Sequence, residues 1–243
     1  GFLVGALCGR GVRSKPVKWW LDARPWQVGT PDPQGGWPAL TTYLTGSNTE
    51  PLKRILSVIG EHGGNAVIIE AGYMGVDYRA EYSAFYSQLF QSVPDSAHRL
   101  HFFRFSGPEA VPQSPMEVAA RGTYLGYAVL RPLPMGSVAR ACIAPPPNMR
   151  SLIRTSVLDR VHLFDLELTV RGVPFMQQDA QFASCAHAAA WMCHQSGALR
   201  GDTHSRPSAD FALGVDRLYP AFRKFPTTGL TDAHLSELFN MAG

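Results

Sequence analysis

The sequence has few of the features that mark membrane, disulfide-rich and metal-binding proteins. No apolar run approaches the roughly 20 residues that a membrane-spanning helix needs, so we expect no membrane partner. Neither CxxC nor HExxH occurs, which leaves no recognisable zinc spacing, and we expect no metal and no cofactor. Only four cysteines are present, too few and too irregularly spaced for a disulfide framework: Cys8, Cys142, Cys185 and Cys193.

Charge is also scarce. Charged residues make up 17% of the 243 residues, the formal net charge is only +3, and the basic residues form no stripe, so nucleic acid is not expected as a partner. Hydrophobic residues reach 45%, enough for a substantial core. The sparse cysteines favour a reducing, cytoplasmic setting. The alternative is a partly removed signal peptide, because residues 1–9 are small and apolar.

The order of periodic segments predicts an α+β protein. We expect residues 1–150 to form an N-terminal α/β region with a β-hairpin, and residues 151–243 to form a second module. Leu52, Ile55, Leu56 and Ile59 recur at helical spacing, whereas Ala66–Ile69 is typical of a buried strand. Further expected elements are an aromatic helical stripe over 77–90, a strand over 99–105, hairpin strands over 123–130 and 137–143, a strand over 161–170, and a helix capped by Thr231.

The chemistry-bearing stretch lies between Pro174 and Trp191. A glutamine-rich loop there precedes a helix of small residues that begins at or just before Cys185 and ends at Ser196–Gly197. The first N–H groups of a helix have no internal partner, and the helix dipole places partial positive charge beside them. A thiolate is stabilised there, and the thiolate is the nucleophile. The alternative is a buried packing residue, because free cysteine is among the most buried residue types.

The glutamines and Cys185, followed by alanines and Trp191, resemble the Gln…Cys loop and central helix of papain-like cysteine peptidases, especially the bacterial C39-like branch. The resemblance covers the chain from about Phe175 to the C-terminus. It implies the loop-plus-central-helix half of a papain-like fold, with Cys185 as nucleophile and Gln178 in the oxyanion hole. Gln181 is the less favoured alternative. In that family the glutamine precedes the cysteine by six residues; Gln178 precedes it by seven, so a one-residue bulge would be required.

A nucleophilic cysteine needs a histidine base within hydrogen-bond reach. His187 and His194 lie on the expected helix, where they face away from Cys185 or are too distant. The base could be His204, His234 or a residue beyond Gly243, and we favour a missing segment of a longer enzyme. The expected function is a cysteine hydrolase that acts on a peptide or protein through a thioester. The alternatives are acyltransferase or transglutaminase chemistry from the same thioester, or a non-catalytic binding module.

Overall fold

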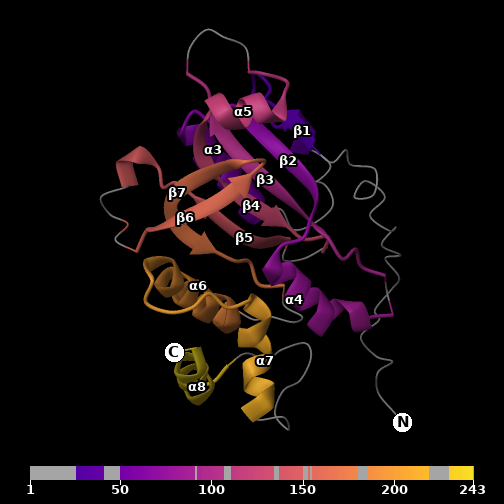
Figure 1. Ribbon diagram of the computed structural model, residues 1–243, viewed down its shortest axis with the longest axis vertical. Coiled ribbons are helices and arrows are strands. Elements are labelled where there is room, and N and C mark those ends of the chain that lie inside the picture. Colours follow the sequence, from indigo (N-terminus) through magenta and orange to yellow (C-terminus); the bar gives the residue numbers. More distant parts are fainter. Residues whose placement is uncertain are drawn as a thin grey trace.

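A computed structural model describes residues 26–40, 50–90, 92–106, 111–133, 137–149, 153, 155–179, 185–218 and 230–242. It is an α+β protein in which an antiparallel sheet carries helices on its faces and three further helices beyond it (Figure 1). The apolar segment 1–9 lies outside the described residues. The elements in chain order are β1 (Trp26–Gly29), η1 (Pro38–Leu40), α3 (Glu50–Glu61), β2 (Ala66–Tyr73), α4 (Val76–Ala84), η2 (Tyr86–Gln88), β3 (Ala97–Arg104), α5 (Pro115–Arg121), β4 (Thr123–Leu130), β5 (Val138–Ile143), η3 (Pro147–Met149), β6 (Val157–Leu163), β7 (Leu166–Phe175), α6 (Cys185–Arg200), α7 (Ser208–Leu218) and α8 (Asp232–Ala242).

The seven strands follow the order β1-β2-β3-β4-β5-β7-β6, and every neighbouring pair is antiparallel. The expected hairpin is confirmed, with Tyr127 of β4 opposite Cys142 of β5. The sheet crosses the division expected at residue 150, because β7 pairs with β5 along Ala141–Ile143. The strands of the C-terminal part therefore complete the sheet that the N-terminal part begins.

The apolar run in β2 is buried because both faces of the sheet are covered. Val67 and Ile69 pack in one core with Leu52, Leu56 and Ile59 of α3, which confirms that helix and its apolar stripe. Ala66 and Ile68 point to the opposite face and pack with α5 and the β6–β7 hairpin. Burial of each large aliphatic side chain contributes about 2 kcal/mol, so α3 is anchored by its packing.

The single strand expected over 161–170 is wrong, because the chain reverses within it. β6 ends at Leu163, Phe164 adopts a left-handed backbone (φ 55°), and β7 begins at Leu166. No glycine or proline marks this turn. The left-handed conformation costs a residue with a side chain about 1 kcal/mol, and the Phe164 ring packs on Trp26 of β1 with ring centroids 4.7 Å apart. This tertiary contact offsets the strain and draws the outermost strands of the curled sheet toward each other.

The helical stripe expected over 77–90 is also shorter than predicted. α4 ends at Ala84, and η2 follows as a single 3₁₀ turn. Tyr78 and Tyr86 still pack in the core beside Tyr127 and Val129 of β4. Tyr78 and Tyr86 are therefore core residues, although two elements carry them, whereas Phe90 at the end of the expected stripe is exposed.

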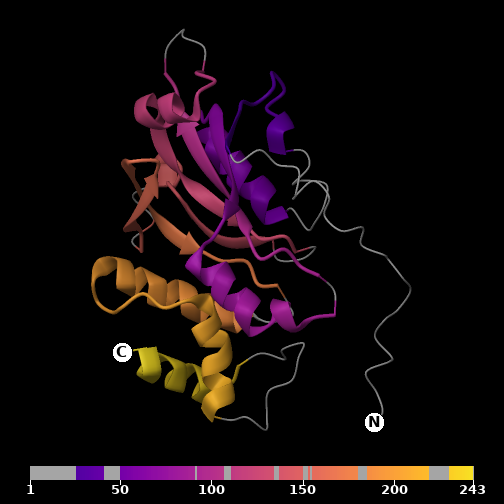
Figure 2. The same cartoon turned by 45° about the vertical axis from the view of Figure 1, so that its right-hand side comes forward.

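The three C-terminal helices lie together beyond the sheet, next to α4 and at the end opposite α5 (Figures 1 and 2). Trp191 of α6, Phe211 of α7 and Leu238 of α8 share one apolar core. α6 does not end at Ser196–Gly197 as expected, but continues to Arg200. The Thr231 cap is confirmed, since its hydroxyl accepts the N–H of His234 at 3.3 Å.

Candidate functional site

Cys185 is the first residue of the 16-residue helix α6, and it is exposed. The first turn of a helix has N–H groups without an intrahelical partner, and the helix dipole favours negative charge there. Cys193 is exposed on the same helix, two turns further on. Cys142 differs from both, because burial raises the pKa of its thiol to about 12 and keeps it protonated. Exposure and helix position together distinguish Cys185 from the other described cysteines.

The loop that leads to α6 is tied to the sheet through Gln177. Its N–H donates to the carbonyl of Val138 (2.9 Å), and its side-chain Oε1 accepts the Val138 N–H (3.1 Å). Its own carbonyl accepts a hydrogen bond from the Arg131 guanidinium. Gln177 therefore continues the pairing of β7 with β5 by two further hydrogen bonds.

Gln178 is exposed, and Asp179 is buried. The Asp179 carboxylate accepts a hydrogen bond from the hydroxyl of Tyr86. Asp179, which lies six residues before Cys185, is thus buried, while Gln178 before it is exposed to solvent. Gln181 lies outside the described residues, as does all of 180–184.

The histidines of the C-terminal helices are engaged elsewhere. His187 is buried on α6, and the Nε2 of His194 donates to the backbone carbonyl of His204 at 2.9 Å. Because His194 is nine residues beyond Cys185, this contact lies about 14 Å along the helix axis from the thiol. His234 accepts the N–H of Thr231 on its Nδ1 at 3.3 Å, at the start of α8. Within the described ranges no histidine side chain is hydrogen-bonded to Cys185.

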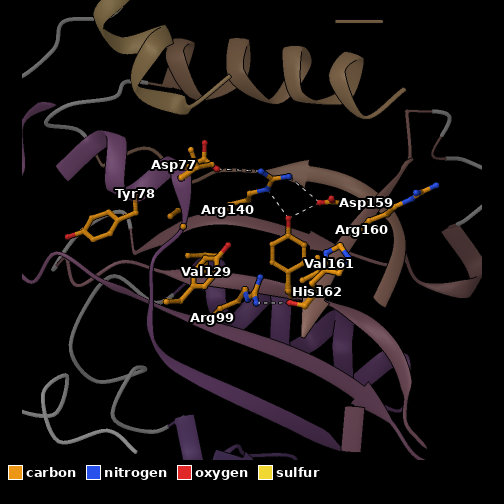
Figure 3. Close-up of a pocket in the computed structure, with 14 residues that line it drawn as sticks. Asp77, Tyr78, Arg99, Val129, Arg140, Asp159, Arg160, Val161 and His162 are labelled. Atoms are coloured by element: carbon orange, nitrogen blue, oxygen red, sulfur yellow. Dashed lines mark hydrogen bonds and ion pairs between the residues drawn. The ribbon is translucent and has the colours of Figure 1, made fainter. Parts of the chain in front are cut away.

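A buried ionic joint connects α4, the sheet and α7. It consists of Asp77 and Glu81 of α4, Arg131 directly after β4, Arg140 of β5 and Asp159 of β6. Arg131 pairs with Glu81, and both side chains are fully buried. Arg140 lies between Asp77 (3.4 Å) and Asp159 (3.3 Å), as Figure 3 shows.

The ionic joint also holds the helices in place. The first residue of α7, Ser208, donates its N–H to Asp77 (3.1 Å) and its hydroxyl to Glu81 (2.7 Å). The Arg140 guanidinium lies 5.6 Å from the ring centroid of Trp191, which is fully buried in α6. Burial raises the pKa of both Asp77 and Glu81. The position of α6, and with it the place of Cys185, thus depends on charges buried at this junction.

Sequence reasoning did not find the ionic joint, although a signal was present. Asp77 and Glu81 are one helical turn apart within an otherwise aromatic stripe, on the side that packs inward with Tyr78. Acidic residues at core-facing positions are rarely buried without a partner. Two such acids predict buried arginines, but the identity of those arginines depends on the fold.

Neither a membrane segment nor a metal cluster is found in the part of the chain that the structure describes. None of the described helices is both long and apolar enough to cross a membrane. Nor do three or more histidine, cysteine or acidic side chains gather there at metal-binding distance. In comparisons with known proteins, no family model, no curated protein and no solved structure matches this chain.

Proposed function

We propose that the protein is a cysteine hydrolase, in the first instance a peptidase, with Cys185 as its nucleophile. The observation that supports this most directly is the exposed thiol at the first residue of a long helix, eight residues after Gln177, which is bound to the sheet. Nucleophilic cysteines occur at helix N-termini because the thiolate is stabilised there. The resemblance to the Gln…Cys stretch of papain-like peptidases supports the same role.

In this proposal the Cys185 thiolate attacks a peptide carbonyl and forms a C–S bond. Gln178, exposed just before the helix, donates from its side-chain amide to the oxyanion, together with the N–H of Cys185. The amine leaves with a proton from a histidine, and water then hydrolyses the thioester to release the acid. An amine in place of water would make the protein an acyltransferase or a transglutaminase.

The second candidate is a binding module that keeps the helix and loop without the chemistry. It is favoured by two contacts of the histidines, since His194 binds the backbone carbonyl of His204 and the His234 ring accepts the N–H of Thr231. Under the first candidate a histidine must come within hydrogen-bond reach of Cys185 to carry this proton. Under the second, no carrier is required.

Alkylation of the native protein by iodoacetamide, followed against pH and located by peptide mass, separates the two candidates. Cys193 is the matched control, because it is exposed on the same helix but two turns from its N-terminus. We expect Cys185 to react at least about tenfold faster than Cys193 at pH 6.5, because an activated cysteine is already thiolate where an ordinary one is a thiol. Equal rates at both cysteines would favour the binding module.

Oxyanion stabilisation is tested with Gln178→Ala. We expect its alkylation rate at Cys185 to equal that of the native protein, because alkylation forms no oxyanion. Hydrolysis of a peptide or thioester substrate should fall about 10²-fold, as when one oxyanion donor is removed from other hydrolases. Unchanged hydrolysis in this variant would exclude Gln178 from the reaction, and hydrolysis that survives in Cys185→Ala would exclude the proposed nucleophile.

A further inference from the structure

A cavity of about 300 Å³ lies between the start of α4, strands β3 to β5 and strand β6 (Figure 3). Its volume is at the lower end of the range for small-molecule sites, which suits a ligand with few heavy atoms. Among the polar and aromatic residues that line it are Tyr73, Asp77, Arg99, Tyr127, Arg140 and Asp159, and Tyr78, Arg160 and His162 also contribute to its wall. Charged groups of both signs therefore line a cavity that also has aromatic walls.

One end of the cavity carries more negative than positive charge. Arg140 is the only guanidinium that contacts Asp77 and Asp159 in the described part of the chain, and it must compensate both carboxylates. The Tyr127 hydroxyl donates to Asp159 (2.7 Å) and accepts from the Nε of Arg140 (2.8 Å). Burial raises the pKa of Tyr127, so this hydroxyl remains a neutral donor. Burial raises the pKa of Asp77 in spite of Arg140, so its carboxylate is incompletely compensated, and a ligand cation beside it would favour the ionised form.

The other end of the cavity offers hydrogen-bond donors from Arg99. Its Nε donates to Glu70 (2.6 Å), one of its terminal nitrogens donates to the carbonyl of His162 (3.0 Å), and its guanidinium lies 4.1 Å above the ring of Tyr73. A guanidinium has five N–H donors in a rigid fork that matches a carboxylate. Among the described residues only two of these donors are used. The remaining donors can bind an anionic group that enters the cavity.

We propose that this cavity binds a small zwitterion, an amino acid or a dipeptide, with its ammonium group at Asp77 and Asp159 and its carboxylate at Arg99. The opposite charges at the two ends and the small volume support this ligand class. The exposed Arg160 points away from Arg140 and takes no part (Figure 3). This site is separate from Cys185 and does not depend on the proposed hydrolase activity.

Isothermal titration with alanyl-alanine tests the proposal. The capped probes are N-acetyl-alanyl-alanine, which lacks the ammonium group, and alanyl-alanine amide, which lacks the carboxylate. We expect saturable binding of the zwitterion and at least about tenfold weaker binding of each capped form, because charge-assisted hydrogen bonds are the strong ones. No saturable heat up to about 10 mM, or equal binding of capped and uncapped forms, would overturn the proposal.

Two variants assign the ends of the ligand. Asp159→Asn should weaken alanyl-alanine about tenfold while leaving the N-acetyl form unchanged, and Arg99→Gln should weaken alanyl-alanine while leaving the amide unchanged. Arg200→Gln, at an exposed pair with Asp202, is the control and should bind like the native protein. If either cavity variant weakens all three probes equally, the residue acts only through stability and the proposed orientation is wrong. The native comparison of the three probes decides the proposal even if a variant does not fold.

Discussion

Replacing Arg131 with methionine should destabilise the protein far more than the loss of one ordinary ion pair. Arg131 and Glu81 are both fully buried, so within the ionic joint the variant leaves Glu81 with the Ser208 hydroxyl as its donor. Breaking a buried pair by removing one partner costs about 3–5 kcal/mol. The carbonyl of Gln177 also loses a donor, which costs about 1 kcal/mol more. We therefore expect urea denaturation at pH 7.5 to show a loss of about 4–6 kcal/mol in the free energy of unfolding.

The loss should be smaller in acid. Burial raises the pKa of Glu81 in the folded protein, so protonation of Glu81 stabilises the folded state. This contribution is fully present below the unfolded pKa of about 4.3, and it is lost as the pH rises through the pKa of the folded protein. Without Arg131 that pKa rises further, so the variant should regain part of its lost stability between pH 7.5 and pH 4.5. Denaturation of both proteins at the two pH values measures the difference.

The matched control is Arg200→Met, which removes an exposed arginine from its 3.0 Å pair with Asp202. An exposed pair contributes about 0–1 kcal/mol, so this variant should be nearly as stable as the native protein at both pH values. The reasoning is refuted if Arg131→Met loses no more than the control at pH 7.5. It is also refuted if the loss of stability does not depend on pH.

Two further substitutions test the packing around the candidate site. Gly126→Ala should lower the free energy of unfolding by about 2–4 kcal/mol, because φ is +129° and the added Cβ would clash with the backbone carbonyl of Cys142. The control is Gly201→Ala, which also has a positive φ (+87°) but no atom within 4 Å of the added Cβ, and it should cost about 1 kcal/mol. Equal losses in the two variants would contradict the clash. Trp191→Ala should lower the free energy of unfolding by about 3–5 kcal/mol, because the Trp191 ring is fully buried. The same variant should bring the iodoacetamide rates of Cys185 and Cys193 closer together, because α6 loses its packing. Urea denaturation and iodoacetamide labelling measure these effects, and a Trp191 variant with native stability would contradict the packing described for α6.

Local patterns in the sequence were sufficient for much of the fold. The helical spacing of Leu52, Leu56 and Ile59 predicted α3, and the two β-rich runs around Pro132–Gly136 predicted the β4–β5 hairpin. The start of α6 at Cys185 was also predicted, because a polar loop gives way there to a run of small helix-forming residues. These signals act over a few residues and do not depend on distant partners.

Predictions failed where a distant contact outweighs local preference. The turn at Phe164 has no local marker and is stabilised by Trp26, more than 130 residues earlier in the chain. The candidate site shows the same division. The sequence predicted Cys185 and Gln178 as site residues, but only the fold decides that Gln178 is exposed and that the backbone of His204 lies beside His194.

The sequence by itself determined the α+β composition, the main helices and hairpin, and the cysteine at a helix N-terminus, because these follow from periodicity and from local hydrogen bonding. Only the tertiary structure decided how the sheet curls and which charges are buried together. Asp77 and Glu81 of α4, Arg131 directly after β4, Arg140 of β5 and Asp159 of β6 meet at the junction of the sheet and the helices. Their pairing is set by the electrostatic cost of burying a charge without a partner, which depends on distances through space and not on spacing along the chain.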